Sequence, residues 1–395
     1  MSKNLFILAN SPGELNGWVK PVICSLAERL KGVSVFFVSL PCPYASGMEA
    51  ECAKSFPLID KCMTVKEAVR LSRVVRKNKN MVLQFGGDPF FGFALSKKLC
   101  ACWATYTARP SFAGCADRYF LPDRAFVKRF EKKHINKKRY EVAGNLMVDS
   151  VTTELTAEQV REKLGIAPES EIISMLPGSR PFEYTFIVPF FISAAEELME
   201  KFPGRTFVMP LAPTVDEEVL CDVLKKNGYS FTPEYPRRVQ CRNGEIIMVR
   251  KNTFDVIAAS ELAAALPGTN NLQIASLGIP LVMLAPMNMA EQIPLDGIPG
   301  LLPTSNFVGR SLKRRLVLWY NRRERFVSLP NRLAGHEIVP EHRYIMTPHM
   351  AADAVSEVLG SEKRKSEIKE GYKDLGLKAG AADVIAAYVC DFFEN

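Results

Sequence analysis

The chain has no apolar run close to the roughly 20 residues that a membrane-spanning helix needs. Residues 5–9 are a short apolar run without a small-residue cleavage site after it, so we expect no secretory signal peptide. The ten cysteines include no C-x-x-C pair and the four histidines no i, i+4 pair, which argues against a zinc or thioredoxin-like centre. These absences predict a cytoplasmic protein with reduced thiols, without a metal and without a cofactor.

The hydrophobic residues that are present follow an alternating pattern. Hydrophobic residues make up 47% and charged residues 24% of the 395 residues, enough for two globular domains with their own cores. Short β-rich apolar runs alternate with amphipathic stretches, which predicts α/β domains with parallel sheets covered by helices on both faces. The expected strands are 5–9, 33–40, 81–85, 104–107, 118–121, 140–143, 171–175, 206–211, 246–249, 262–266 and 280–284.

Two glycine turns each follow an apolar run and precede a helical pattern: Leu176-Pro177-Gly178-Ser179-Arg180 and Pro267-Gly268-Thr269-Asn270-Asn271. Such a turn lets backbone N–H groups and the positive end of a helix approach a phosphate. A guanidinium such as that of Arg180 binds diphosphate oxygens bidentately. One Pro-Gly turn alone is most often only a turn, but two with an arginine predict a nucleotide-sugar site.

A third segment, Ser328-Leu329-Pro330-Asn331-Arg332-Leu333-Ala334-Gly335-His336-Glu337-Ile338-Val339-Pro340-Glu341, is long and idiosyncratic. Together with the LPGSR turn it resembles the lipid-A-disaccharide synthase family, whose members carry LPGSR, SGTAxLE and a closing SLPNLLAGRxxVPE. Residues 144–149, GNLMVD, are similar to the family's GNPLVD. The resemblance implies a GT-B fold, with two doubly wound Rossmann-like domains facing across a cleft. We predict an acceptor-side domain at 1–160, a nucleotide-sugar domain at 161–345, and helices at 346–395 that pack back on the first domain.

The resemblance also implies an activity and a set of donor-site residues. The activity is that of an inverting, metal-independent hexosyltransferase, which moves a sugar from a UDP-activated donor, such as an acylated glucosamine, to a lipid-linked acceptor during lipid A disaccharide synthesis. Asn331 would reach the nucleotide, and its alternative role is to fix a Pro-Asn turn. Arg180 could instead pair with Glu183 on the same helix. The donor-binding residues we expect are Gly178, Ser179, Arg180, Gly268, Thr269, Asn270, Gln273 and Asn331.

Two motifs depart from the family pattern. Gln273 stands where SGTAxLE ends in a glutamate that resembles a ribose-binding carboxylate, which removes the bidentate acceptor. The family's GExSGD reads Gly13-Glu14-Leu15-Asn16-Gly17-Trp18, with tryptophan in place of the aspartate. We expect Gly13, Asn16 and Trp18 on the acceptor side, where Trp18 either stacks on a sugar ring or packs in the core.

Asp88 is the predicted general base, because it follows a strand and is flanked by phenylalanines that would raise its pKa. It matches the family's IDAPDFN-like segment only with a shift, and an aspartate before proline also commonly starts a turn. Glu14 is the second catalytic carboxylate that we consider. Its place at a helix start predicts a depressed pKa and hence a poor base.

The net charge of +8 is concentrated in two segments, around 124–139 and 310–325. The second interleaves arginines with Trp319 and Tyr320, which suits the surface of an anionic membrane. We therefore expect peripheral attachment to the inner face of the cell membrane through residues 310–325. Nucleic acid attracts the same charges and is the less favoured partner, and a solvated helix face is the remaining explanation, above all for the first segment.

Two other functional classes stay open. A UDP-N-acetylglucosamine 2-epimerase-like isomerase uses similar double-domain architecture but needs several acidic residues and a histidine around the sugar. A non-catalytic membrane- or nucleic-acid-binding protein would explain the basic segments alone, and it predicts salt-sensitive binding without turnover.

Overall fold

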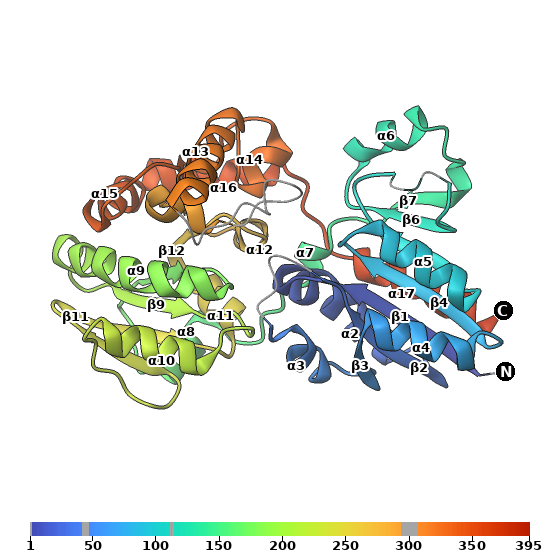
Figure 1. Cartoon of the computed structure of the whole chain (residues 1–395). Helices are drawn as coiled ribbons and strands as arrows, with labels where there is room; N and C mark the ends of the chain where they lie inside the picture. Colours follow the sequence, from blue (N-terminus) through green and yellow to red (C-terminus); the bar gives the residue numbers. More distant parts are fainter. Residues whose placement is uncertain (1, 42–46, 111, 113, 294–306) are drawn as a thin grey trace. The chain divides into compact units, whose positions relative to one another are not determined.

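The computed structural model describes residues 2–41, 47–110, 112, 114–293 and 307–395. The chain divides into two compact units (Figure 1). The first comprises Met1–Ser150 and Lys378–Asn395, and the second Val151–Leu377. The first break therefore falls at residue 150 rather than at the predicted 160.

A sheet of seven parallel strands organises the first unit, in the order β3-β2-β1-β4-β5-β6-β7. Alternate residues of β1 enter two separate cores, Leu5 and Ile7 on one face and Phe6 and Leu8 on the other. Both faces are thus covered, as expected for a parallel sheet. The strands are β1 Lys3–Ala9, β2 Val33–Ser39, β3 Lys61–Thr64, β4 Lys79–Phe85, β5 Cys102–Tyr106, β6 Arg118–Leu121 and β7 Tyr140–Val142. The helices are α1 Pro12–Glu14, the π-helix η1 Leu15–Val19, α2 Lys20–Ala27, α3 Glu49–Lys54, α4 Val65–Val75, α5 Pro89–Leu99, η2 Arg124–Phe126, α6 Val127–Lys132, η3 Lys137–Arg139, α7 Leu146–Asp149 and α17 Ala381–Glu394.

The second unit repeats this plan with one antiparallel edge strand. Its sheet has the order β10-β11-β9-β8-β12-β13-β14, and only the β10–β11 pair is antiparallel. The strands are β8 Ile172–Leu176, β9 Thr206–Pro210, β10 Arg237–Cys241, β11 Gly244–Val249, β12 Ser260–Ala265, β13 Leu281–Leu284 and β14 Glu341–His342. The helices are α8 Ala157–Leu164, α9 Pro181–Lys201, α10 Glu217–Lys226, α11 Thr253–Ala258, α12 Asn270–Ser276, η4 Met287–Gln292, α13 Phe307–Arg323, α14 Leu329–Ala334, α15 Pro348–Leu359 and α16 Glu362–Lys373.

The strand order positions the candidate sites. In each sheet the chain first winds outward in one direction and then returns to the other side of the first strand, so β1 and β4, and likewise β8 and β12, are neighbours. Ligands of doubly wound sheets bind beyond the carboxyl ends of the strands at such a reversal. The segments that follow these four strands carry Glu14, Asp88 and both predicted glycine turns.

The C-terminal helices are shared between the two units, which corrects the prediction that all of 346–395 packs on the first. Val355 and Leu359 of α15 and Ile368 of α16 lie in the core of the second unit. Only α17 belongs to the first unit, where Ile385 and Val389 enter its core. The GNLMVD motif supports this attachment, because the Asp149 carboxylate accepts hydrogen bonds from the Gly380 N–H at 2.6 Å and the Ala382 N–H at 2.5 Å.

Candidate functional site

In the first unit, a buried carboxylate lies between the segments that follow β1 and β4. Glu14 ends α1, and its Oε2 accepts a hydrogen bond from the Asn10 N–H at 3.1 Å. Gly86 and Gly87 follow β4 with φ of +68° and +63°. A Cβ on Gly86 would collide with the Glu14 carboxyl group. The two glycines therefore allow the carboxylate to pack directly on the backbone of the second loop.

Burial raises the pKa of Glu14 to about 7, although hydrogen bonds from the backbone of Asn10, Gly87 and Ser11 lower it. The prediction of a depressed pKa at a helix start is therefore wrong. Glu14 lies in the first turn of a helical run that continues through η1 and α2, and desolvation outweighs the dipole of that helix. A carboxyl group with this pKa can take up a proton near neutral pH.

Asp88 lies in a different environment from the one its neighbours suggested. Its side chain is exposed and caps α5, where it accepts the Phe90 N–H at 2.9 Å. Gln84 fixes the turn by donating its Nε2 to the carbonyls of Gly86 and Asp88, at 2.9 and 3.0 Å. The expectation that phenylalanines surround the carboxylate is thus wrong, and the turn-starting role is present.

Gly13, Asn16 and Trp18, which we predicted on the acceptor side, lie around the π-helix Leu15–Val19. Turns of π-helix are rare in proteins, but those that occur are often found at functional sites. Trp18 makes an edge contact with Tyr106, with ring centroids 5.3 Å apart, and packs against the core of the first unit. The half-buried Asn16 accepts a hydrogen bond from the Cys52 thiol at 3.7 Å. For Trp18 the structure favours packing over an exposed stacking platform.

In the second unit, the LPGSR turn already holds an anion of the protein itself. Oε2 of Glu183 accepts the N–H groups of Ser179 and Arg180 at 2.6 and 2.9 Å, and Oε1 accepts Nη1 of Arg180 at 3.0 Å. Gly178 has φ of +99°, and a Cβ there would collide with the same carboxylate. The turn forms an anion-binding nest that is filled by this carboxylate, and its binding of a diphosphate stays a prediction. The amides of Ser179 and Arg180 are occupied by Glu183, so they are not open to a phosphate in this structure.

The second turn opens α12 after β12. Gly268 is exposed, and its N–H donates to Oδ1 of Asn271 at 3.4 Å, while Nδ2 of Asn271 donates to the Leu266 carbonyl at 2.9 Å. Thr269 is the N-cap of α12, and the half-buried Asn270 is its first residue. Gln273 is buried within the same helix. Gly268, Thr269 and Asn270 therefore present the accessible part of this turn.

Asn331 is fully buried, and all its hydrogen-bonding capacity is used. Its Nδ2 donates to the Val339 carbonyl at 2.7 Å and to Glu341 at 2.9 Å, and its Oδ1 accepts the N–H groups of Ile338 and Val339 at 2.7 and 2.8 Å. An asparagine side chain can make four such bonds. Asn331 therefore fixes the turn, which was its alternative role, and a contact with the nucleotide stays a prediction without support from these bonds.

Glu341 completes this arrangement by accepting the Ser328 N–H and hydroxyl at 2.9 and 2.7 Å. The conspicuous 328–341 motif is therefore a self-contained hydrogen-bonded unit that ties α14 to β14.

The chain is similar to known proteins. Residues 127–293 match the family model described as lipid-A-disaccharide synthetase. The lipid-A-disaccharide synthase of Myxococcus xanthus (strain DK1622) is 28% identical over 238 residues, which cover 60% of this chain and 52% of that protein. That of Syntrophus aciditrophicus (strain SB) is 25% identical over 313 residues, which cover 78% and 68%. The chain is thus similar to the lipid-A-disaccharide synthase family, and the family model matches it over less than half of its length.

The similarity is distant, and the chain spans only 52% and 40% of the length of the Myxococcus xanthus and Gloeothece citriformis synthases. Among solved structures, S. aureus MnaA in complex with UDP aligns with a TM-score of 0.57 and 11% identity, covering 99% of this chain and 97% of that one. HepE of Anabaena in complex with UDP and glucose aligns at 0.54 and 10% identity, covering 99% of both. These likenesses establish a GT-B-like fold.

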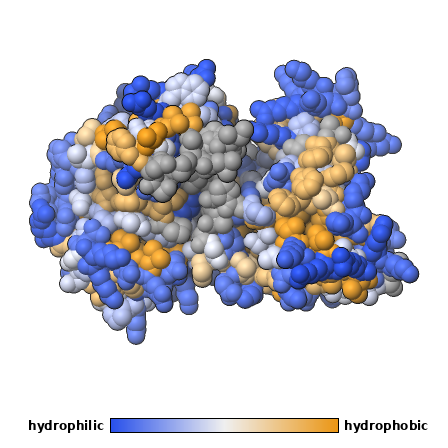
Figure 2. All heavy atoms as spheres, in the orientation of Figure 1, coloured by the Kyte–Doolittle hydropathy of each residue, from blue (hydrophilic) through white to orange (hydrophobic). Residues whose placement is uncertain are grey.

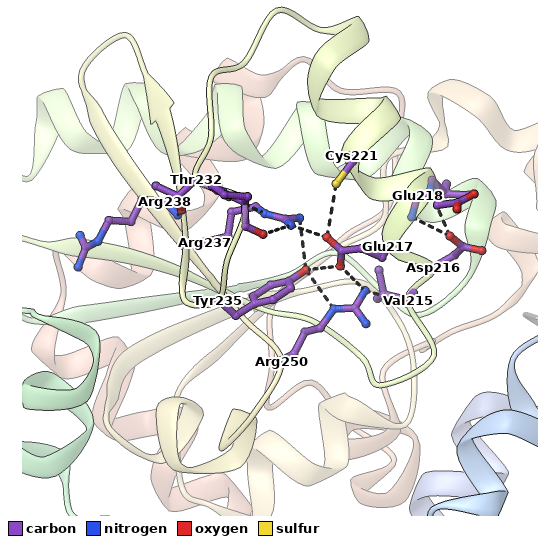
Figure 3. A network of polar contacts seen from close by, with 12 residues as sticks. Val215, Asp216, Glu217, Glu218, Cys221, Thr232, Tyr235, Arg237, Arg238 and Arg250 are labelled. Atoms are coloured by element: carbon purple, nitrogen blue, oxygen red, sulfur yellow. Dashed lines mark hydrogen bonds and ion pairs between the residues drawn. The ribbon is translucent and has the colours of Figure 1, made fainter.

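One polar network of the second unit was not predicted from the sequence (Figure 3). Glu217, at the start of α10, accepts hydrogen bonds from Arg237 and from the Tyr235 hydroxyl, and it pairs with Arg250 at 3.0 Å. Arg250 also donates to the Val215 carbonyl at 2.7 Å. These contacts join α10 to the β10–β11 hairpin, so they are a structural connection between elements that follow one another closely in the chain.

The basic helix α13 divides its charges between two roles. Arg310 and Arg314 pair with the buried Glu291 at 3.0 and 2.9 Å, and Lys313 is buried. The opposite side of the helix exposes both apolar and basic side chains. We call this the α13 stripe, and its members are Val308, Leu312, Arg315, Trp319, Arg322 and Arg323.

Within the described parts of the chain, no group of three or more His, Cys, Asp or Glu residues is arranged to hold a metal ion. No helix in these same parts has the length and apolarity needed to cross a membrane.

Proposed function

We propose that the chain is a glycosyltransferase that moves a sugar from a UDP-activated donor to the hydroxyl of a lipid-linked acceptor. Its similarity to the lipid-A-disaccharide synthase family supports the reaction class. A UDP donor is supported by structural neighbours that were solved with UDP or UDP-N-acetylglucosamine. Formation of a lipid A disaccharide from an acylated UDP-glucosamine is the specific reaction that we favour.

The donor is proposed to bind the second unit beyond β8 and β12. Arg180 supplies a guanidinium for the diphosphate, and Glu183 orients it through the contact at 3.0 Å. Gly268, Thr269 and Asn270 offer accessible backbone and side-chain groups at the start of α12. Ser179 and Gly178 shape the turn, and Gln273 supports α12 from within.

A buried carboxyl group with a pKa of about 7, Glu14, is the observation that carries the proposed mechanism. The carboxylate takes the proton of the acceptor hydroxyl while its oxygen bonds to the anomeric carbon of the donor sugar. The bond from that carbon to the diphosphate breaks, and UDP leaves with the electron pair. Attack opposite the leaving group inverts the anomeric centre and needs no metal. Asp88 would then hold the start of α5, with Gly13 and Asn16 shaping the acceptor side.

The test compares Glu14→Gln with Asp88→Asn in an assay of UDP release from UDP-N-acetylglucosamine and acylated UDP-glucosamine, with and without a monosaccharide lipid acceptor. We expect Glu14→Gln to lower turnover by about 100-fold or more, and Asp88→Asn to lower it by less than tenfold. Near-normal turnover of Glu14→Gln with a dead Asp88→Asn would reverse the two roles. Epimerisation of UDP-N-acetylglucosamine without an acceptor would identify an isomerase instead.

The lipid-linked acceptor requires contact with a membrane, and we propose that the α13 stripe provides it at the cytoplasmic face. Trp319 lies exposed beside arginines, and the Arg323 guanidinium stands over its ring at 4.6 Å from the centroid. Aromatic and basic side chains on one helix face are typical of interfacial helices. Nucleic acid is the less favoured partner, because the stripe is half apolar.

A further inference from the structure

Helix α5 exposes an aromatic side immediately after Asp88. Phe90, Phe93 and Lys97 stand three and four residues apart and therefore share one face of the helix. The Phe90 side chain is 53% exposed. Figure 2 shows apolar side chains gathered on this side of the first unit, in the region of α5. Because the Phe90 ring is largely exposed, it contributes little to the packing of the core. Binding of a partner would remove this apolar surface from water.

Phe112 extends this side from a different segment. Its ring stacks on that of Phe93, with centroids 5.3 Å apart and planes 9° apart, yet the residue is 42% exposed. Its φ is +46°, an unfavourable backbone conformation for a bulky residue. The Phe112 carbonyl accepts hydrogen bonds from the Cys115 N–H at 2.8 Å and the Tyr119 hydroxyl at 3.3 Å, which hold the turn. The unfavourable backbone conformation of Phe112 is held by these hydrogen bonds and leaves its ring exposed, which indicates a role in binding.

Cations border these rings. Lys97 Nζ lies 5.8 Å from the centroid of Phe93, and Lys98 follows it, exposed at the end of α5. On the other side Arg139 donates to the Gly114 carbonyl at 2.6 Å, two residues beyond Phe112. Helix α5 itself contains no acidic residue. Aromatic rings bordered by lysine and arginine suit the boundary between lipid chains and phosphate headgroups.

We propose that Phe90, Phe93 and Phe112, the aromatic patch, insert among the hydrocarbon chains of an anionic bilayer, with Lys97 and Lys98 on its headgroup phosphates. The occupant is lipid rather than protein because the charges within α5, Lys97 and Lys98, are all basic, with Asp88 confined to the cap of the helix, and because the patch adjoins the carboxyl end of β4, where Glu14 lies. The inference rests on the proposed function in one respect, the role of the aromatic patch. In that function the patch presents a lipid-linked hydroxyl to the Glu14 side of the first unit.

The first experiment measures partition of the full chain onto phosphatidylglycerol-containing vesicles by sedimentation. Phe90→Ser with Phe112→Ser should lower the partition coefficient by about tenfold or more, because two rings lose their apolar burial. Lys97→Gln with Lys98→Gln should lower it mainly at low salt. The matched control is Ile345→Ser with Val384→Ser, which removes exposed apolar side chains outside the patch and should leave partition unchanged.

A second measurement is independent of any loss of folding. Phe90→Trp places an indole at the exposed position, and lipids brominated along the acyl chain should quench its added emission on vesicles. Absence of this quenching, together with unchanged partition of Phe90→Ser with Phe112→Ser, would overturn the proposal. A double-serine variant that changes only the oligomeric state, measured by light scattering, would assign the patch to a protein contact and would likewise overturn it.

The patch and the proposed activity can fail separately. Stabilisation by UDP, and transfer to a water-soluble acceptor without acyl chains, should be the same in the double-serine variant and in the parent. If the parent catalyses no transfer at all but its partition still depends on Phe90 and Phe112, then the lipid surface stands and the proposed reaction is wrong.

Discussion

The raised pKa of Glu14 bears both on its proposed catalytic role and on the stability of the fold. Its pKa rises from 4.5 to about 7 on folding, so the native state binds a proton more tightly than the unfolded chain does. The native state is therefore favoured below about pH 4.5 and loses stability as the pH rises through 7. A shift of this size corresponds to roughly 3 kcal/mol.

We predict that Glu14→Gln, which removes the charge but keeps the shape, is more stable than the parent at pH 8 by about 2 kcal/mol, with the two converging near pH 4. Urea unfolding across this pH range measures the difference. A variant that is less stable at every pH would mean that the hydrogen bonds to the carboxylate outweigh its desolvation.

Arg180 and Asn331 separate a ligand-binding role from a structural one. Arg180→Ala should weaken UDP binding by about tenfold or more, because a charge-assisted contact is lost. Its effect on the free energy of unfolding should be small, since the Arg180 side chain is one-third exposed.

Asn331→Ala should instead affect stability and not UDP binding, because it leaves the buried N–H groups of Ile338 and Val339 without their acceptor. It should destabilise the protein by about 2–4 kcal/mol and leave UDP affinity unchanged. Calorimetry with UDP and denaturant unfolding give both quantities, with Arg242→Ala as an exposed-arginine control. Equal UDP affinity in Arg180→Ala and the parent would remove Arg180 from the donor site.

At the scale of elements, α13 shows that a basic segment is not a uniform surface. Arg310 and Arg314 are needed to neutralise Glu291, so their replacement would test folding rather than membrane binding. The informative variant replaces Arg315, Arg322 and Arg323 of the α13 stripe by glutamine. At about 1 kcal/mol for each basic residue near an anionic surface, partition onto such vesicles should fall by about 100-fold. Neutral vesicles provide the comparison. If the triple variant sediments like the parent, the stripe is a solvated helix face.

The sequence was sufficient for the periodic elements and insufficient for the side-chain partners. Runs such as residues 262–266 followed by Pro-Gly predict a strand and a turn, because apolar alternation and turn residues are local signals. The occupation of the LPGSR amides by Glu183 depends on the local backbone path, which the residue spacing does not specify. The burial of Glu14 is not local either, since it requires the Gly86–Gly87 turn of another strand. For the same reason Asn331 looked like a ligand: its partners at 338–341 become visible only once the segment folds back.

At the scale of the whole molecule, the division into units was predicted in outline, and the assignment of the C-terminal helices was not. The apolar faces of α15, α16 and α17 look alike in the sequence. What separates them is the connection at Asp149, whose carboxylate holds the start of α17. The second unit is consequently continuous in the chain, Val151–Leu377, whereas the first is completed only by Lys378–Asn395.

This difference in continuity predicts how each unit behaves alone. A fragment of residues 151–377 contains its whole sheet and the proposed donor site, so it should unfold cooperatively. UDP at a concentration of 100 times its dissociation constant should stabilise this fragment by about 2.7 kcal/mol.

A fragment of residues 1–150 lacks Ile385, Val389 and Phe393 of α17, which fill one of its cores. It should show no cooperative thermal transition until a peptide of residues 378–395 is added. Calorimetry of each fragment, with and without UDP or the peptide, measures these outcomes. A scrambled peptide controls for non-specific apolar binding. If residues 1–150 unfold at the same temperature with either peptide, α17 is dispensable to the first unit. If UDP stabilises the whole chain but not residues 151–377, the donor site needs groups from the first unit.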